Sequence, residues 1–191
     1  MNDPYFFGYG SLVNRDTHTY PGAKKARLAG WRRGWVHVDP WPVAVLTAVA
    51  APGSEIDGLI ARVPGSDWVA LDERERNYER LPATENVTHA LAGPLDIAVY
   101  AVHPDLHGAP QSPAPILLSY LDVVVQGYLR EFGPEGARQF FETTDGWHTP
   151  VLNDRAAPRY PRHKVLTDDE RAVVDRWLDE IEALVQPLGQ A

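Results

Sequence analysis

Two short segments of the chain contain residue types that could carry out chemistry together. Residues 7–12 read Phe-Gly-Tyr-Gly-Ser-Leu, and residues 71–75 read Leu-Asp-Glu-Arg-Glu. A turn of small residues exposes backbone N–H groups, and Ser11 adds a hydroxyl, so that the first segment could bind a carboxylate. The second segment offers a carboxyl group that could act as a general acid and base.

The position of Glu75 within its segment is unusual for a charged residue. Apolar residues recur at helical spacing after Ser66, a typical N-cap residue, and the predicted apolar face contains Trp68, Leu71 and Tyr78. Glu75 falls between Trp68 and Leu71 on this face. Its polar neighbours are expected to point elsewhere: Glu73, Arg74, Arg76 and Asn77. A carboxyl group on a buried face costs free energy, so Glu75 is either functional or paired with an arginine.

Several other kinds of site are excluded or disfavoured. The chain has no cysteine, which removes thiol nucleophiles, disulfides and thiolate metal sites. The glycine-rich segment has Val13 where a dinucleotide fingerprint needs a third glycine, and neither a Walker A lysine nor a G-x-S-x-G elbow is present. His103 and His107 have i, i+4 spacing, but neighbouring proline and glycine indicate a loop. We therefore expect no metal site.

The charge of the chain argues against nucleic acid and membrane partners. Its 26 acidic and 18 basic residues give a formal net charge of -8. Basic and aromatic residues are interleaved over 24–35, which could suit single-stranded nucleic acid. The better interpretation is a twisted strand with Trp on one face and Arg on the other, or an edge strand guarded by charge. The N-terminus lacks a signal-peptide pattern, and no apolar run is long enough to cross a bilayer. We expect a cytoplasmic globular protein.

The first half of the chain is predicted to form strands. Short runs rich in β-branched and aromatic residues are separated by Gly, Pro, Asp and Ser. The predicted strands cover residues 4–9, 27–38, 43–50, 56–63, 86–92 and 95–102. Gly93-Pro94 is a candidate hairpin turn between the last two.

The second half is predicted to be helical, within one domain over residues 1–191. One helix is expected over 116–132, ended by Gly133-Pro134, and another after Thr167, which forms a capping-box pattern with Glu170. The apolar face of the last helix is expected to include Val173, Val174, Trp177, Leu178, Ile181, Leu184 and Val185. Residues 147–164, rich in proline and arginine, are expected to brace the fold rather than bind substrate.

Taken together, the two chemical segments resemble the gamma-glutamylcyclotransferase superfamily, which includes ChaC-like and AIG2-like proteins. The family pairs a YGS-type loop after its first strand with a catalytic Glu in a segment resembling L-D-x-R-E, and Glu75 stands at that position here. Leu12 is more similar to the ChaC branch. Softer matches lie at 28–33, 57–61 and 115–127. The resemblance covers about residues 5–132 and leaves 133–191 as a helical C-terminal extension.

This resemblance implies both a fold and a reaction. The fold is α+β, a small mixed and mostly antiparallel β-barrel surrounded by helices. The activity is that of a gamma-glutamylcyclotransferase, a lyase or transferase of glutathione metabolism. It cyclises a γ-glutamyl amide or peptide and releases 5-oxoproline together with an amine or amino acid. Because the substrate's own amine is the nucleophile, no metal or cofactor is expected.

The resemblance also implies the site residues and the partners. Glu75 is the acid–base catalyst, and the substrate-binding residues are Tyr9, Gly10, Ser11, Leu12, Tyr78 and Tyr120. The spacing from Glu75 to Tyr78 is shorter than in familiar members. The partner is a small γ-glutamyl molecule, and the protein is a monomer or a homodimer. The alternative is a non-catalytic module that binds an acidic metabolite in the same barrel cavity.

Overall fold

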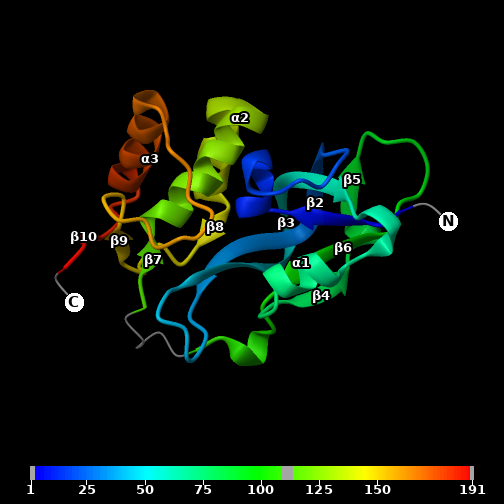
Figure 1. Ribbon diagram of the computed structural model, residues 1–191, viewed down its shortest axis with the longest axis horizontal. Coiled ribbons are helices and arrows are strands. Elements are labelled where there is room, and N and C mark those ends of the chain that lie inside the picture. Colours follow the sequence, from blue (N-terminus) through cyan, green and yellow to red (C-terminus); the bar gives the residue numbers. More distant parts are fainter. Residues whose placement is uncertain (1–2, 109–113, 190–191) are drawn as a thin grey trace.

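The computed structural model describes residues 3–108 and 114–189 and is built around one curled sheet (Figure 1). The strands pair in the order β4-β6-β1-β3-β2-β5, and β8 pairs with the outer side of β2. All neighbours are antiparallel except β1 with β6 and β2 with β8. The strands are β1 (Tyr5–Gly8), β2 (Lys24–Val36), β3 (Val45–Arg62), β4 (Glu79–Pro82), β5 (Val87–His89), β6 (Ile97–Ala101) and β8 (Thr144–Asp145).

The long β2–β3 hairpin gives the sheet its curvature. The two strands pair over most of their length, with a register shift between Ala29 and Trp31. Such an irregularity increases the local twist and bends the strand. The result is a half-barrel of mostly antiparallel strands with few helices. The predicted α+β class and mostly antiparallel sheet are confirmed.

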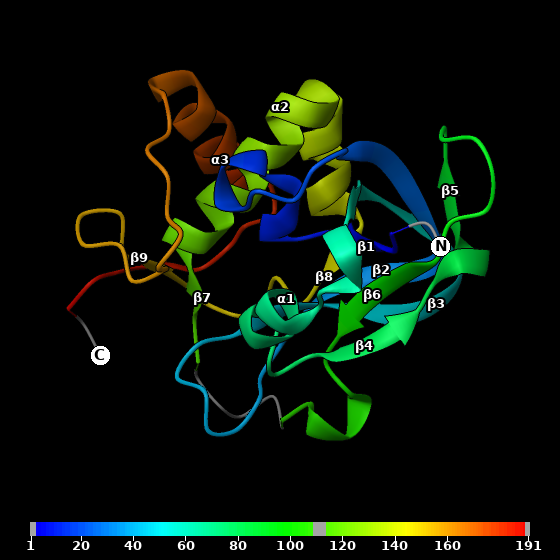
Figure 2. The same ribbon diagram turned by 45° about the vertical axis from the view of Figure 1, so that its right-hand side comes forward.

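Three helices and a second, parallel sheet complete the described structure. The helices are α1 (Val69–Arg74), α2 (Leu118–Glu142) and α3 (Asp168–Glu180), and the small sheet pairs β10 (Val185–Pro187), β9 (Val151–Asn153) and β7 (Ile116–Leu117). Helices α2 and α3 lie side by side, whereas α1 lies apart from them beside β4 and β6 (Figure 2). Short 3-10 turns cover Ser11–Val13 (η1), Arg15–Thr17, Pro64–Ser66, Thr84–Asn86 and Pro104–Leu106.

The main core lies between the curled sheet and α2. Leu121, Val124 and Tyr128 of α2 are buried there, as the predicted apolar face requires. The first helical segment of α2 ends at Gly133-Pro134, as predicted, because Gly133 leaves helical geometry (φ 72°, ψ −169°). A second helical segment, which the sequence did not predict, continues from Pro134 to Glu142. Proline fits at this restart because the first turn of a helix needs no N–H donor.

Three strand and helix predictions are corrected by the structure. The predicted strands 43–50 and 56–63 are parts of the single strand β3. Gly93-Pro94 does not join a hairpin, because β5 pairs with β2 while β6 pairs with β1 and β4. The helix expected from Ser66 begins only at Val69, since Ser66 has a left-handed backbone (φ 56°).

The C-terminal part after residue 133 is only partly helical. The capping box of Thr167 and Glu170 opens α3 as predicted, and Val174 and Leu178 are buried. Leu184 and Val185 are exposed, however, because the helix ends at Glu180 and the chain enters β10. None of the helices in the described ranges is both long enough and apolar enough to span a bilayer.

Candidate active site

A cavity of about 200 Å³ opens where η1, the start of β3, the end of α1, the start of α2 and the loop after β9 meet. Its wall is formed by Ser11, Trp41, Val43, Ala44, Val45, Leu46, Arg74, Glu75, Tyr78, Leu117, Tyr120, Tyr160 and Arg162. A smaller space of about 30 Å³ adjoins it and reaches Tyr9, Gly10 and Leu12. Both spaces share Ser11, Leu46, Glu75, Tyr78 and Tyr120. All of the sequence-predicted site residues therefore border this region.

Glu75 lies at the end of α1, on the wall common to both spaces. Its backbone N–H closes the last turn on Leu71 O at 2.9 Å, and its carbonyl accepts from Tyr78 N–H at 2.7 Å. The side chain is 16% exposed. Burial raises the pKa of this carboxyl group, although the positive charges of Arg74 and Arg162 oppose the shift.

The helical pattern predicts that Arg74 points away from Glu75, but in the structure the two side chains lie together. Its Nε lies 3.1 Å from a Glu75 carboxylate oxygen, and its guanidinium also donates to Thr17 O at 2.9 Å and Ser11 Oγ at 3.1 Å. Helix α1 ends at Arg74, and Glu75 departs from helical geometry (φ −102°, ψ 25°), which brings the two neighbouring side chains together. Glu75 is therefore paired with an arginine and also faces the cavity, and its functional role stays a prediction.

The Ser11 hydroxyl has two donors aimed at its oxygen. Arg74 donates to Ser11 Oγ, and the Tyr160 hydroxyl lies 2.9 Å from the same atom. Arginine can only donate, and the two hydroxyls have one hydrogen each, one of which is used between them. With Tyr160 as the donor in this bond, the Ser11 O–H remains free to donate to a third atom.

Tyr78 and Tyr120 place two further hydroxyls at the cavity. Tyr78 donates to Leu46 O at 2.9 Å. The Tyr120 hydroxyl approaches Gly10 so closely that a Cβ at residue 10 would lie 2.7 Å from its oxygen. Burial raises the pKa of both hydroxyls well above the usual value, so that they remain protonated donors at neutral pH.

The side chains of Tyr9 and Leu12 support the loop and offer no free polar group to the cavity. The Tyr9 hydroxyl donates to Tyr100 O at 2.6 Å, and Leu12 packs in a buried cluster with Tyr100. The Tyr9 carbonyl accepts from Arg33 Nε at 3.1 Å and from the Tyr128 hydroxyl at 2.9 Å. The loop thus stands on a fixed hydrogen-bonded base.

Arg33 is an almost fully buried cation held by neutral groups. It is 1% exposed and donates to backbone carbonyls and to the hydroxyls of Thr143 and Tyr128, with the Tyr128 ring 4.8 Å from its guanidinium. Arg33 therefore faces inward with Trp35, which corrects the expected separation of Arg and Trp on β2. Arg32 does point outward and pairs with Asp145 at 2.8 Å. Arg27 pairs with Asp57 and Glu55, which leaves less positive charge on β2 for nucleic acid.

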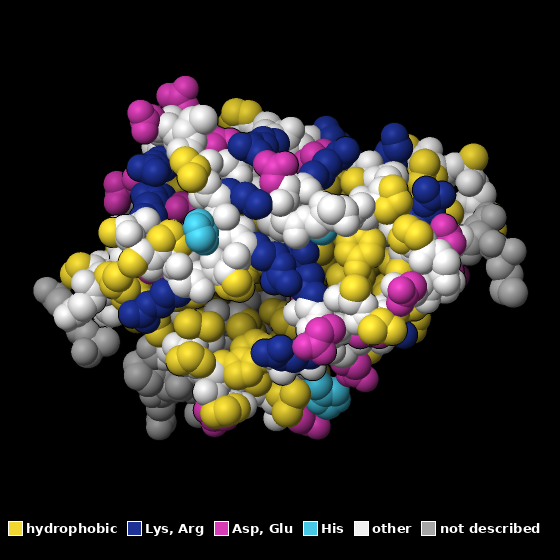
Figure 3. All heavy atoms as spheres, in the orientation of Figure 1, with side chains coloured by type: hydrophobic (Ala, Val, Ile, Leu, Met, Phe, Trp, Pro, Cys, Tyr) yellow, Lys and Arg dark blue, Asp and Glu magenta, His cyan; other side chains and the backbone are white. Residues whose placement is uncertain are grey.

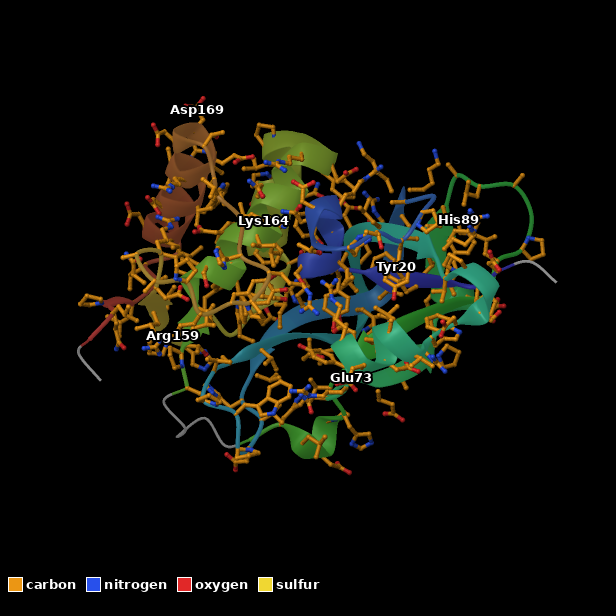
Figure 4. The ribbon with its side chains drawn as sticks, in the orientation of Figure 1. Tyr20, Glu73, His89, Arg159, Lys164 and Asp169 are labelled. Carbon is orange, nitrogen blue, oxygen red and sulfur yellow. The ribbon has the colours of Figure 1, made fainter. Side chains whose placement is uncertain are left out.

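The loop after β9 contributes the cavity residues that sequence reasoning missed. Asp154 is completely buried and accepts hydrogen bonds from Ser119 N–H (2.7 Å), Ser119 Oγ (2.6 Å) and Arg159 N–H (2.8 Å). This anchor braces the loop, as expected. The same loop also carries Tyr160 and Arg162 to the cavity wall, so bracing alone is not its whole role. Figure 4 labels Arg159, directly before Tyr160, and Glu73 on α1.

Comparison with known proteins agrees with this fold. The family model described as Gamma-glutamyl cyclotransferase, AIG2-like, matches residues 6–140. No curated protein sequence matches the chain significantly. The similarity of Leu12 to the ChaC branch stays a prediction.

Solved structures resemble the chain at low sequence identity. A structure described as Gamma-glutamyl cyclotransferase has a TM-score of 0.58 and 16% identity, over 91% of this chain and 99% of that one. An uncharacterized protein from Homo sapiens gives 0.58 and 16%, over 92% and 99%. YkqA from Bacillus subtilis gives 0.59 and 19%, over 76% of this chain and 57% of that one. These likenesses support the fold, and the family match covers most of the chain. The chain therefore belongs to the AIG2-like gamma-glutamyl cyclotransferase family.

Proposed function

We propose that this protein cyclises a γ-glutamyl amide or peptide and releases 5-oxoproline. The observation that carries the proposal is the partly buried Glu75 carboxyl group, which lines both the smaller space at the Gly10–Ser11 loop and the larger cavity. A carboxyl group with a raised pKa is a better proton carrier near neutral pH than an exposed one.

The reaction needs Glu75 to move protons between two nitrogens of the substrate. The carboxylate takes a proton from the α-ammonium group, and the freed amine attacks the γ-carbonyl carbon to form the five-membered ring. The amide C–N bond then breaks as Glu75 returns a proton to the leaving nitrogen. Overall the α-nitrogen loses two protons and the leaving nitrogen gains two, which gives the lactam and an ammonium ion.

The loop and the hydroxyls would hold the substrate and stabilise developing charge. Backbone N–H groups of Gly10, Ser11 and Leu12 would bind the α-carboxylate, which fixes the amine within range of the carbonyl. The free O–H of the Ser11–Tyr160 pair and the Tyr120 hydroxyl are donors for the carbonyl oxygen as it becomes negative. Arg74 would hold the side chains of Glu75 and Ser11 at a fixed distance from each other, because it contacts both.

The test is a panel of γ-glutamyl compounds assayed for 5-oxoproline with the native chain and Glu75→Gln. Loss of the proton carrier is expected to lower kcat by about 10²–10⁴-fold, with the fold retained. Glu73→Gln is the matched control, because the Glu73 side chain is 74% exposed on the same helix and should be dispensable.

Turnover of Glu75→Gln near the native rate would remove Glu75 from the mechanism. Binding of γ-glutamyl compounds by the native chain without any release of 5-oxoproline would instead favour a binding module for acidic metabolites.

A further inference from the structure

One charged residue of the cavity wall has no part in the reaction described above. Arg162 is half-buried and lines the larger cavity, yet it forms no hydrogen bond or ion pair with any residue of ranges 3–108 and 114–189. Two other arginines of the same region are engaged: Arg74 binds Glu75, and Arg155 binds Asp122 and Asp175. A partly desolvated guanidinium gains most from a carboxylate, which it can bind through two parallel hydrogen bonds.

The two adjoining spaces meet at Glu75, so each could hold one part of a substrate whose reacting bond lies there. The smaller space alone contains Gly10 and Leu12 of the loop, whereas the larger one alone contains Trp41, Leu117 and Arg162. If the glutamyl part binds at the loop, the bond that breaks lies beside Glu75. The leaving group then occupies the side formed by Trp41, Leu117 and Arg162.

This leaving-group side combines apolar surface with positive charge. Trp41, Val43 and Leu117 form apolar wall, and Arg162 is the cation beside them. The loop that bears Arg162 also carries Arg159 and Lys164, both labelled in Figure 4. On the face of the molecule drawn in Figure 3, Lys and Arg side chains gather in the middle next to hydrophobic ones, although the whole chain has a net charge of -8. Of Arg159, Arg162 and Lys164, Arg162 alone lines the cavity, so it is the one of the three that is placed to attract an anionic leaving group.

We propose that Arg162 is a specificity-determining residue that binds a free carboxylate of the leaving group. The preferred substrate is then a γ-glutamyl amino acid or peptide with an apolar side chain, rather than a γ-glutamyl amine without a carboxylate. This inference rests on the cyclotransferase function proposed above, and it adds to that function which leaving group the cavity selects.

The experiment compares two substrates that differ only in this carboxylate. γ-Glutamyl-alanine and γ-glutamyl-ethylamide are assayed for 5-oxoproline with the native chain, Arg162→Gln and Arg159→Gln. The native chain is expected to favour γ-glutamyl-alanine by roughly 10–100-fold in kcat/KM, the range of a charge-assisted hydrogen bond. Arg162→Gln should lose most of that preference and stay within about twofold of native on the ethylamide.

Arg159→Gln is the matched control, because Arg159 lies on the same loop but outside the cavity wall. It should leave both rates unchanged. Because Arg162 also lowers the pKa of Glu75, each variant is compared on the plateau of its own pH profile.

The possible failures have different meanings. Equal slowing of both substrates by Arg162→Gln, or the absence of any native preference, would overturn the role of Arg162 and leave the cyclotransferase intact. If the folded native chain released 5-oxoproline from neither compound nor from any other γ-glutamyl compound, the proposed function would fall and this inference with it.

Discussion

At the scale of single residues, two opposing effects act on the pKa of Glu75. Its carboxylate is stabilised by Arg74 at 3.1 Å and by the charge of Arg162, but burial among Tyr78, Tyr120 and Tyr160 favours the protonated form. Burial is the larger effect, and the pKa is raised. A carboxyl group with a raised pKa on a cavity wall is the physical reason to propose a function for Glu75.

The raised pKa of Glu75 makes stability depend on pH in a defined direction. Between the usual value of 4.5 and the raised folded value, the folded state binds more protons than the unfolded state, so the free energy of unfolding falls as pH rises. Glu75→Gln removes this dependence while its amide oxygen can still accept from Arg74. We expect the variant to gain stability relative to the native chain as pH rises through that window.

Urea unfolding of both chains at a series of pH values from about 4 to 8 measures this difference. Glu73→Gln, on the exposed side of α1, should show no comparable trend. A native chain that becomes more stable than Glu75→Gln with rising pH would mean that the ion pair with Arg74 outweighs burial.

At the scale of elements, the loop after β9 is held at one buried point. Asp154 binds the first turn of α2 through Ser119 and its own loop through Arg159 N–H. Tyr160 N–H in turn donates to Ser119 Oγ at 3.2 Å. The position of the Tyr160 ring beside Ser11 therefore depends on a carboxylate that never touches the cavity.

Asp154→Ala should lower stability and disturb the site together. Loss of the acceptor leaves buried N–H groups unsatisfied, which costs about 1–3 kcal/mol. KM for a γ-glutamyl substrate should rise because Tyr160 and Arg162 lose their support. Thermal unfolding and steady-state kinetics give the two readouts. Asp105→Ala, at a side chain 88% exposed, is the control, and an equally small effect of both substitutions would contradict this role.

Elements with a strong local signal were predictable, and those fixed by distant contacts were not. The capping box of Thr167 and Glu170 and the apolar face of α2 are written in the sequence spacing. Strand β4 (Glu79–Pro82) has no such signal, because it is an edge strand whose pairing with β6 alone defines it. The hairpin predicted at Gly93-Pro94 is wrong for the same reason. Strand β5 pairs with β2, which lies about 60 residues earlier in the sequence, and not with the following strand β6.

The same division applies to the site. Helical periodicity placed Glu75 on the buried side of α1, but it could not show that the helix ends one residue earlier and turns Arg74 toward Glu75. Tyr160 and Arg162 lie about 85 residues further along, in a segment without hydrophobic periodicity. Only its proline and arginine content distinguished that segment, and composition alone does not reveal a cavity.

At the scale of the whole molecule, the residues that match the family model do not include all of the residues that form the cavity wall and the main core. The match ends at residue 140, yet the cavity wall includes Tyr160 and Arg162. The packing continues as well, because Trp147 and Trp177 both stack on Phe141, and Val174 and Leu178 belong to the main core. The region after 140 is therefore part of the same packed structure.

A chain ending at residue 143 is expected not to fold stably. It would expose Phe141 and lack the aromatic rings and the α3 side chains that cover α2. Each large apolar side chain that is no longer buried costs about 2 kcal/mol of stability, and several are affected. Circular dichroism melting should show a broad or absent transition where the full chain gives a cooperative one. A sharp transition and native-like turnover by the shortened chain would show that residues 1–143 suffice.

The contact between Gly10 and the Tyr120 hydroxyl couples two positions that are 110 residues apart in sequence. The Tyr120 ring is held edge-on by Trp35 and by Tyr160, so it has little room to retreat from a larger residue 10. A side chain at residue 10 would therefore force the Tyr120 hydroxyl to shift. The absence of a Cβ at residue 10 thus fixes where the phenol oxygen of residue 120 can lie.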